Sequence, residues 1–301
     1  MHDRVVACFQ YGLVSVSITL FNRAVFSVYK FNYPAFFTML QLIVSIIYIL
    51  LLNRAKYLNV ERLTLAGARK VMPLTAFWWL YVVSGMTALR YLNVPMYSVL
   101  RRATTLVVVA GEFYMFNKSP SRDAMVALMA MIGGAVVAGL SDVTYSGLGY
   151  FWVSICVLST AAYLLLIRKL KDTGMNQHTL LLYNNVLALG PMLVVLLASD
   201  ELPGVLSYPR LWEPQFVLFL LTSCSQAFLL NLCIFRCTLI NSALATNVTG
   251  QMKDILTTVL GIALFNDVTL RALNLAGLAL GLLGSMAYSL VSYREAKNGG
   301  R

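Results

Sequence analysis

Positively charged residues occur inside apolar stretches of this sequence that are long enough to cross a membrane. An ionisable side chain at the centre of an inserted helix costs roughly 2.5–3.5 kcal/mol unless protein or water surrounds it. The acidic residues at comparable depth are fewer, so we expect the excess positive charge to face a water-filled cavity. A cavity of that sign suits a polyanion, and the sequence therefore predicts passage of an anionic solute through a membrane. The cations are Arg23, Arg101, Arg102, Arg236 and Lys253, and the acids are Glu112 and Asp254.

Arg101 and Arg102 are adjacent, so their side chains point about 100° apart on a helix. They cannot both face one narrow cavity squarely. We expect one of them to bind substrate or to gate the pathway, while the other pairs with Glu112 or with a helix end. The alternative is that both arginines pair inside the protein and neither meets substrate.

Lys253 stands in a short polar sequence within an apolar stretch. Thr249 and Gln251 supply hydrogen-bonding groups, and Gly250 leaves room for close approach. This combination suits a ligand that carries phosphate and hydroxyl groups. Lys253 and Asp254 diverge on a helix, so they are not expected to form a bridge with each other. We predict that this segment binds substrate, with Lys253 as the main contact.

A second polar cluster, Tyr183, Asn184 and Asn185, lies inside another apolar stretch. Adjacent amides in a membrane helix need hydrogen-bond partners. An Asn side chain can pair with a nucleobase edge, and a Tyr ring can stack on the base. The alternative is that the amides hold neighbouring helices together.

The elements that position these residues are predicted to be membrane helices. Hydrophobic residues make up 59% of the 301 residues and charged residues 12%, about half the charged fraction of a soluble domain. The net charge of +11 lies mostly in short loops, which argues against nucleic-acid binding and for membrane topology. We predict ten helices of membrane-spanning length, and no strands: 5–29, 34–53, 72–92, 95–116, 123–141, 147–167, 180–199, 214–240, 242–265 and 268–292.

The charges in the loops predict the orientation. With ten spans, the side that holds the N-terminus collects 14 Lys and Arg residues, and the opposite side collects 4. Cytosolic loops are the positive ones, so both termini are predicted to be cytosolic. The first apolar run is expected to be a retained anchor rather than a cleaved signal.

Ten spans divide into two five-helix repeats, 1–146 and 147–301, which together form one transporter domain. Since five is odd, the second repeat would be inverted, a recurring transporter design. The fourth and ninth spans support this, because both carry buried cations, continue through Thr-Thr to a Gly and end in Phe-Asn. Facing repeats would bring Arg101, Arg102 and Lys253 to the midplane, where such transporters bind substrate.

The remaining features predict no catalytic residue, cofactor or metal site. The histidines number only two, and the cysteines are expected to be small buried hydrophobes, including Cys233 and Cys237 one helical turn apart. A GxxxG pair, Gly277 and Gly281, predicts close helix packing, either within the chain or in a homodimer. A membrane enzyme would expose Asp or His with metal near the surface, which this sequence lacks. A triose-phosphate or drug carrier would use similar cations without needing a base site.

Several stretches resemble the nucleotide-sugar transporters of the drug/metabolite transporter superfamily, and in particular the branch that carries UDP-glucuronate, UDP-N-acetylgalactosamine and UDP-N-acetylglucosamine. The resemblance covers nearly the whole chain. Asn22 and Arg23 match an Asn-Lys element of that branch, with Arg in place of Lys, and the match predicts that Asn22 binds substrate. The segments that show the resemblance are LFNRAVF (20–26), NVPMYSVLRRAT (93–104), LLLYNN (180–185) and INSALATNVTGQMKDILTTVLG (240–261).

The resemblance implies ten helices in two inverted repeats, in the Golgi or endoplasmic-reticulum membrane. It also implies exchange of a cytosolic nucleotide sugar for a luminal nucleoside monophosphate, UMP for a UDP-sugar. In related GDP-mannose carriers a Phe-Tyr-Asn-Asn motif meets the nucleotide, and here Leu182 replaces the Phe before Tyr183. Lys253 matches the lysine that meets sugar and phosphate. Asp254 stands where the UDP-sugar branch has Asn, and its charge would repel a uronate carboxylate.

Overall fold

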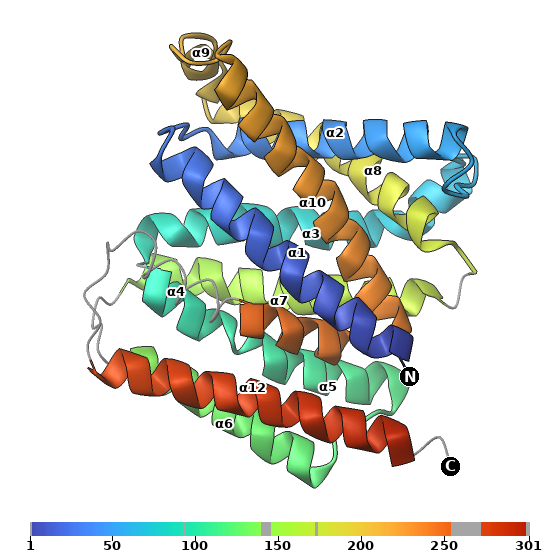
Figure 1. Cartoon of the computed structure of the whole chain (residues 1–301), viewed down its shortest axis with the longest axis vertical. Helices are drawn as coiled ribbons and strands as arrows, with labels where there is room; N and C mark the ends of the chain where they lie inside the picture. Colours follow the sequence, from blue (N-terminus) through green and yellow to red (C-terminus); the bar gives the residue numbers. More distant parts are fainter. Residues whose placement is uncertain (1, 93, 140–145, 172–173, 254–271, 299–301) are drawn as a thin grey trace.

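The computed structural model describes residues 2–92, 94–139, 146–171, 174–253 and 272–298, which form a bundle of α-helices (Figure 1). No strand occurs within these ranges. Residues 243–253 are helical as well. The labelled helices are α1 (His2–Ser27), α2 (Pro34–Arg54), α3 (Leu65–Tyr91), α4 (Val94–Arg101), α5 (Thr104–Phe116), α6 (Arg122–Gly139), α7 (Gly147–Leu170), α8 (Gln177–Ala198), α9 (Glu201–Leu206), α10 (Pro214–Ile240) and α12 (Ala272–Asn298).

Local sequence explains where several helices begin. Pro34 and Pro214 open α2 and α10, at positions where a helix needs no N–H partner. Ser146 and Asn176 cap α7 and α8, since their side-chain oxygens accept from the N–H groups of Gly149 and His178. These caps set the ends of the apolar segments and therefore which residues lie at membrane depth.

Six of the described helices are long and apolar enough to cross a membrane, as the sequence predicted for their ranges. Large apolar side chains point outward along them, which suits contact with lipid rather than water. The other predicted ranges hold the broken pair α4 and α5, the helices α6 and α12, and a helix that is described only through residue 253. The six are Asp3–Phe26, Pro34–Arg54, Leu65–Tyr91, Gly147–Leu170, Gln177–Ala198 and Pro214–Ile240.

The fourth predicted range, 95–116, is not one continuous helix. It breaks between α4 and α5, directly after Arg101. At the break the N–H of Ala103 donates to the carbonyl of Leu100 and the N–H of Thr105 to that of Arg102, three residues back instead of four. Tight turns of this kind inside a membrane helix are tolerated where protein surrounds the backbone, and they often mark functional positions.

Helix packing follows a regular pattern. α3 packs along α7 and also against α8, while α10 packs along α1 and also against α2. α2 pairs with α8, and α6 pairs with α12. Figure 1 shows α6 and α12 side by side at one edge of the bundle, and α1 begins at the same end of the bundle at which α12 finishes.

A short helix that the sequence did not predict, α9, closes the connection between α8 and α10. Glu201, its first residue, accepts hydrogen bonds from the N–H groups of Ala35 and Phe36 at 3.2 and 2.9 Å. A carboxylate at the N-terminus of α2 satisfies N–H groups that have no partner within the helix. Phe31 and Phe216 pack beside it, both fully buried. This end of the bundle is therefore sealed by aromatic rings.

The contact between α6 and α12 depends on glycine. A Cβ at Gly134 would overlap the backbone of Gly277 and Gly281, and a Cβ at Gly284 would overlap the backbone at Met131. The two helices therefore approach backbone to backbone, as small residues permit in membranes. The close packing predicted from Gly277 and Gly281 is thus found within the chain.

Replacing Gly134 with Ala should lower the melting temperature of the detergent-purified protein by several degrees, because the added methyl group must push α12 away. Overpacking of this kind typically costs about 1–3 kcal/mol. Gly133→Ala is the matched control, since no described residue lies within 4 Å of a Cβ built there. Equal melting temperatures for the two variants would contradict the assigned contact.

Candidate substrate-binding site

Helix 243–253 meets the broken helix at Thr105. The Oγ1 of Thr105, fully buried on the first turn of α5, accepts from Gln251 Nε2 at 2.7 Å and from Asn247 Nδ2 at 3.0 Å. Thr105 lies three residues after Arg102. These two bonds therefore place the predicted segment 249–253 beside the predicted arginine pair, although the two are about 150 residues apart in sequence.

Polar atoms where helix 243–253 meets α5 have unused hydrogen-bonding capacity. Gln251 Oε1 and Thr104 Oγ1 are buried and have no hydrogen-bond partner among the described residues. A buried amide oxygen without a donor costs free energy, on the order of 1–3 kcal/mol. Hydroxyl groups of a sugar or ribose are donors that would satisfy it. The site is thus suited to a ligand rich in hydroxyl groups.

The two arginines diverge, as predicted from their spacing. Arg102 is 7% exposed and donates from Nη1 to the carbonyl of Met131 on α6 at 3.4 Å. Arg101 is half-buried, and its guanidinium lies 5.6 Å from the centre of the Tyr97 ring. Arg101, with the larger accessible fraction, is therefore better placed than Arg102 to meet a ligand.

The predicted segment around Lys253 packs against α1. A Cβ at Gly250 would come within 2.8 Å of the Tyr11 hydroxyl, and Thr249 lies beside Gly12. The Thr249 hydroxyl donates to the carbonyl of Ala245 in its own helix at 2.8 Å. Lys253 is half-buried, one turn further along. Asp254, the other residue predicted for this cluster, lies outside the described residues.

Tyrosines that the sequence analysis did not single out face the same region. The Tyr81 ring on α3 lies 5.6 Å from the Tyr163 ring on α7, and Arg101 is close enough to act electrostatically on Tyr81. The Tyr163 hydroxyl is buried and has no partner within the described ranges. A buried Tyr hydroxyl usually finds a partner. The presence of a hydroxyl-bearing residue inside an apolar stretch is the sequence signal that could have identified these tyrosines.

The cluster on α8 is engaged in helix packing. The N–H of Thr64, at the start of α3, donates to the Tyr183 hydroxyl at 2.6 Å, and Asn185 Nδ2 donates to Ser45 Oγ on α2 at 2.7 Å. Asn184 is 1% exposed, and its Oδ1 has no partner in the described part of the chain. Of the three, Asn184 keeps the most hydrogen-bonding capacity for a ligand.

Glu112 joins three helices at one end of the bundle. Its Oε1 accepts from Arg168 Nη1 on α7 at 3.0 Å and from the N–H of Leu244 at 3.1 Å. The acid thus compensates a half-buried guanidinium and also caps helix 243–253. Arg168 further lies 4.9 Å from the centre of the Phe116 ring. Glu112 was expected to pair with Arg101 or Arg102, but its partner is Arg168, which lies just beyond the predicted span 147–167 and was therefore expected in a loop.

Two further polar residues at membrane depth face the α1–α10 contact. Arg236 Nη1 donates to Gln10 Oε1 at 3.0 Å, and Ser223 Oγ donates to Asn22 Oδ1 at 2.6 Å. Asn22, which was predicted to bind substrate, is thus bonded to α10. The Arg23 side chain lies outside what the structure describes.

Comparison with a solved crystal structure supports the fold alone. The two chains superpose with a TM-score of 0.69 at 13% sequence identity, over 98% of this chain and 99% of the other. The match covers almost the whole of both chains, so this helical arrangement occurs in a protein with little sequence similarity.

Sequence comparisons identify relatives along almost the whole length. A UDP-N-acetylglucosamine transporter of Arabidopsis thaliana is 31% identical over 94% of this chain and 86% of its own. A GDP-mannose transporter of the same plant is 28% identical over 98% and 91%. Residues 4–289 match the Triose-phosphate Transporter family. The resemblance to nucleotide-sugar transporters is therefore confirmed, and the chain belongs to the Triose-phosphate Transporter family.

Proposed function

We propose that this protein is a nucleotide-sugar antiporter. It takes a cytosolic UDP-sugar (UDP-glucuronate, UDP-N-acetylgalactosamine, UDP-N-acetylglucosamine or UDP-glucose) and returns luminal UMP by alternating access. Lys253 and Arg101 neutralise the diphosphate, and Gln251 and Thr104 bind hydroxyl groups. The α8 cluster contributes to the base site through Asn184. The names of the relatives, most of them UDP-sugar transporters, support the nucleotide-sugar class.

One observation supports the site: Gln251 and Asn247 donate to Thr105, close in sequence to the arginine pair, beside polar atoms that have no partner among the described residues. A cationic site with spare acceptors suits a ligand that combines phosphate with hydroxyl groups. Binding of the anion would offset repulsion among the cations. Without a bound anion, the cations would repel one another and the empty carrier would change conformation slowly. The return step would therefore require bound UMP.

We also propose that ten helices form two inverted repeats, 1–146 and 147–301. Helix packing supports this arrangement. Exchanging each helix for its counterpart five spans along turns the α3–α7 contact into the α10–α1 contact and the α3–α8 contact into the α10–α2 contact. The α2–α8 and α6–α12 contacts map onto themselves. A pseudo-two-fold axis produces these equivalences.

The membrane is proposed to be that of the Golgi or endoplasmic reticulum, with both termini cytosolic. The excess of Lys and Arg on the N-terminal side supports the orientation. The common end of the bundle at which α1 begins and α12 finishes agrees with it (Figure 1).

GDP-mannose exchange for GMP is the second candidate. Two Arabidopsis thaliana relatives are GDP-mannose transporters, and the Tyr-Asn-Asn sequence on α8 is common to that class. A triose-phosphate-type or drug carrier is the third candidate, because such a carrier would use the cations to bind its substrate and would need no base site.

Uptake into proteoliposomes distinguishes these candidates. Vesicles loaded with UMP, GMP or no nucleotide are offered labelled UDP- and GDP-sugars, and we expect UDP-sugar uptake that requires internal UMP. Uptake of GDP-mannose that requires GMP would replace the UDP assignment. No uptake with any nucleotide, from protein shown to be folded, would favour a phosphate or drug carrier.

Lys253→Ala should abolish exchange and weaken binding of the nucleotide sugar about 10- to 100-fold. A hydrogen bond to a charged group is worth about 1.5–3 kcal/mol. Binding is measured as the rise in melting temperature with added ligand. Lys169→Ala, at an exposed cation near the end of α7, is the control and should behave as the unaltered protein. Normal exchange by Lys253→Ala protein would refute the role of Lys253.

Asn184→Ala and Asn185→Ala should have different effects. Asn184→Ala should reduce nucleotide-sugar binding with little change in melting temperature, because its Oδ1 has no hydrogen-bond partner among the described residues. Asn185→Ala should lower stability by about 1–3 kcal/mol, since it leaves the buried Ser45 hydroxyl without its donor. Thermal unfolding with and without ligand measures both. If Asn184→Ala changes only stability, the α8 cluster is a packing feature.

Glu112→Gln should destabilise the protein by about 1–3 kcal/mol, because the half-buried Arg168 loses its counter-charge. The Gln oxygen still accepts from Leu244, so the helix cap is retained. The double variant Glu112→Gln/Arg168→Gln should be more stable than the sum of the single effects predicts. Strictly additive effects in thermal unfolding would show that the two side chains are not coupled.

A further inference from the structure

Two cysteine thiols meet between α1 and α10. Cys8 Sγ and Cys237 Sγ lie 3.3 Å apart, although the residues are 229 positions apart in sequence. A disulfide has an S–S distance of about 2.05 Å, so the sulfurs need to approach by about 1.2 Å. Cys233, the neighbour expected for Cys237 from spacing, is one turn away on α10 and is not the thiol in contact.

An amide group is directed at both sulfurs. Asn241 Nδ2 lies 3.3 Å from Cys8 Sγ and 3.7 Å from Cys237 Sγ, and it also donates to the carbonyl of Arg4 at 3.1 Å. A hydrogen-bond donor at a sulfur favours the thiolate over the thiol. The thiolate is the reactive form of cysteine. Asn241 is thus positioned to favour reaction at this pair.

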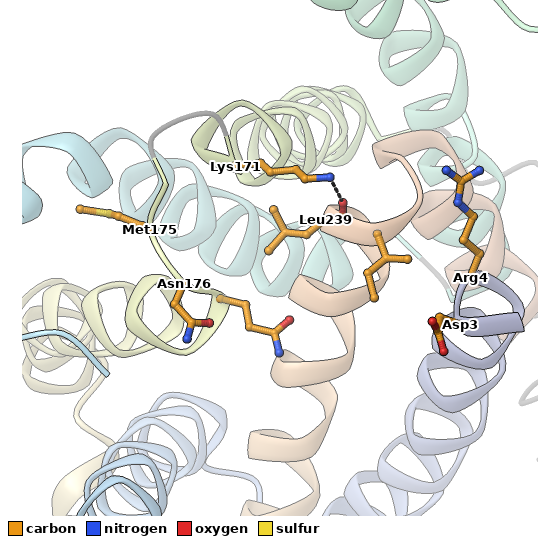
Figure 2. Close-up of a pocket in the computed structure, with 8 residues that line it drawn as sticks. Asp3, Arg4, Lys171, Met175, Asn176 and Leu239 are labelled. Carbon is orange, nitrogen blue, oxygen red and sulfur yellow. Dashed lines mark hydrogen bonds between the residues drawn. The ribbon is translucent and has the colours of Figure 1, made fainter. Parts of the chain in front are cut away.

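Water-soluble reagents can approach this end of the bundle. A pocket of about 490 Å³ opens there. Figure 2 shows Asp3 and Arg4 of α1 on one side of the α10 end and Met175 and Asn176 on the other, with Lys171 bonded to the Leu239 carbonyl at 3.0 Å. Leu239 and Ile240, which also line the pocket, lie in sequence between Cys237 and Asn241. The lining comprises Asp3, Arg4, Lys171, Met175, Asn176, Gln177, Leu239 and Ile240.

We propose that Cys8 and Cys237 form a peroxide-sensitive dithiol that oxidises to a disulfide joining α1 to α10. Cys8 is half-buried and Cys237 is fully buried, so peroxide reacts at Cys8. The Cys8 thiolate attacks one peroxide oxygen, the O–O bond breaks, and hydroxide leaves as water after taking a proton. Cys237 then attacks the Cys8 sulfenic sulfur, the S–O bond breaks and a second water leaves. Two thiols and one hydrogen peroxide give one disulfide and two waters.

The disulfide would act on the candidate substrate site through α1. Cys8 also has a side-chain contact with Thr249, and Gly12 one turn further lies against the same threonine. A covalent bond would fix α1 against α10 beside helix 243–253. In a reducing cytosol the pair rests as thiols, so peroxide would switch the carrier off reversibly.

The test is peptide mapping of the purified full-length protein. Protein is treated with hydrogen peroxide, remaining thiols are blocked, and proteolytic peptides are analysed by mass spectrometry without reduction. We expect a peptide containing Cys8 linked to one containing Cys237, which dithiothreitol separates. Absence of this linked pair, or linkage of Cys237 to Cys233 instead, would overturn the proposal.

Variants supply the controls. Cys8→Ser and Cys237→Ser should each lose the linked peptide, while Cys233→Ser should keep it. Oxidation should raise the melting temperature of the unaltered protein and of Cys233→Ser, and dithiothreitol should reverse the rise. No rise in either protein, or an equal rise in Cys8→Ser, would contradict a linkage at this pair.

Exchange in proteoliposomes gives the functional readout. Peroxide should cause loss of uptake by the unaltered protein, and dithiothreitol should restore it. Cys8→Ser should keep its uptake after peroxide. Linked peptides together with unchanged uptake would overturn the switch. If no nucleotide sugar is transported at all, the peptide map still decides the disulfide, so failure of the proposed function is distinguishable.

Discussion

Glu112 carries a negative charge into the bundle, and the relative positions of three helices depend on how that charge is compensated. Its carboxylate accepts from the guanidinium of Arg168 at the end of α7 and from the N–H of Leu244 in the first turn of helix 243–253. An ionised group in an apolar medium must find partners within the protein. The partners come from residues far apart in sequence, so the bond fixes the register of α5 against both.

The position of helix 243–253 in turn sets the candidate site. Glu112 caps the helix at one end, and Gln251 and Asn247 bind Thr105 nearer the other. Between these contacts the helix is held against α5 and α1. The position of Lys253 follows from this packing. Of the arginine pair, Arg102 is bonded to α6. The break after Arg101 lets α4 hold Arg101 over Tyr97, independently of α5.

Hydrophobic periodicity and length were enough to predict the six apolar helices that the structure describes. Six of the apolar ranges matched described helices because membrane helices satisfy their own backbone and need about 20 apolar residues. Arg101 and Arg102 contact different neighbours, Tyr97 and the carbonyl of Met131, as expected for adjacent residues.

Partners across the bundle could not be predicted. The turn at Arg102 contains no proline or glycine from which it could be predicted. Arg168 appeared to belong to a loop, and Tyr183 and Asn185 gave no sign that Thr64 and Ser45 would face them. Cys8 and Cys237 meet only because α1 and α10 run alongside each other. Such pairings depend on tertiary packing, which cannot be read from the pattern of a single sequence.

The glycine contact between α6 and α12 has a consequence for the origin of the chain. In the two proposed repeats these helices are counterparts, so a half-length protein could make this contact only with a second, oppositely inserted copy of itself. Gly134 on one side and Gly281 and Gly284 on the other are what such a dimer interface would retain after gene duplication and fusion. Fusion of two such copies would turn this symmetric contact into an internal contact of one chain.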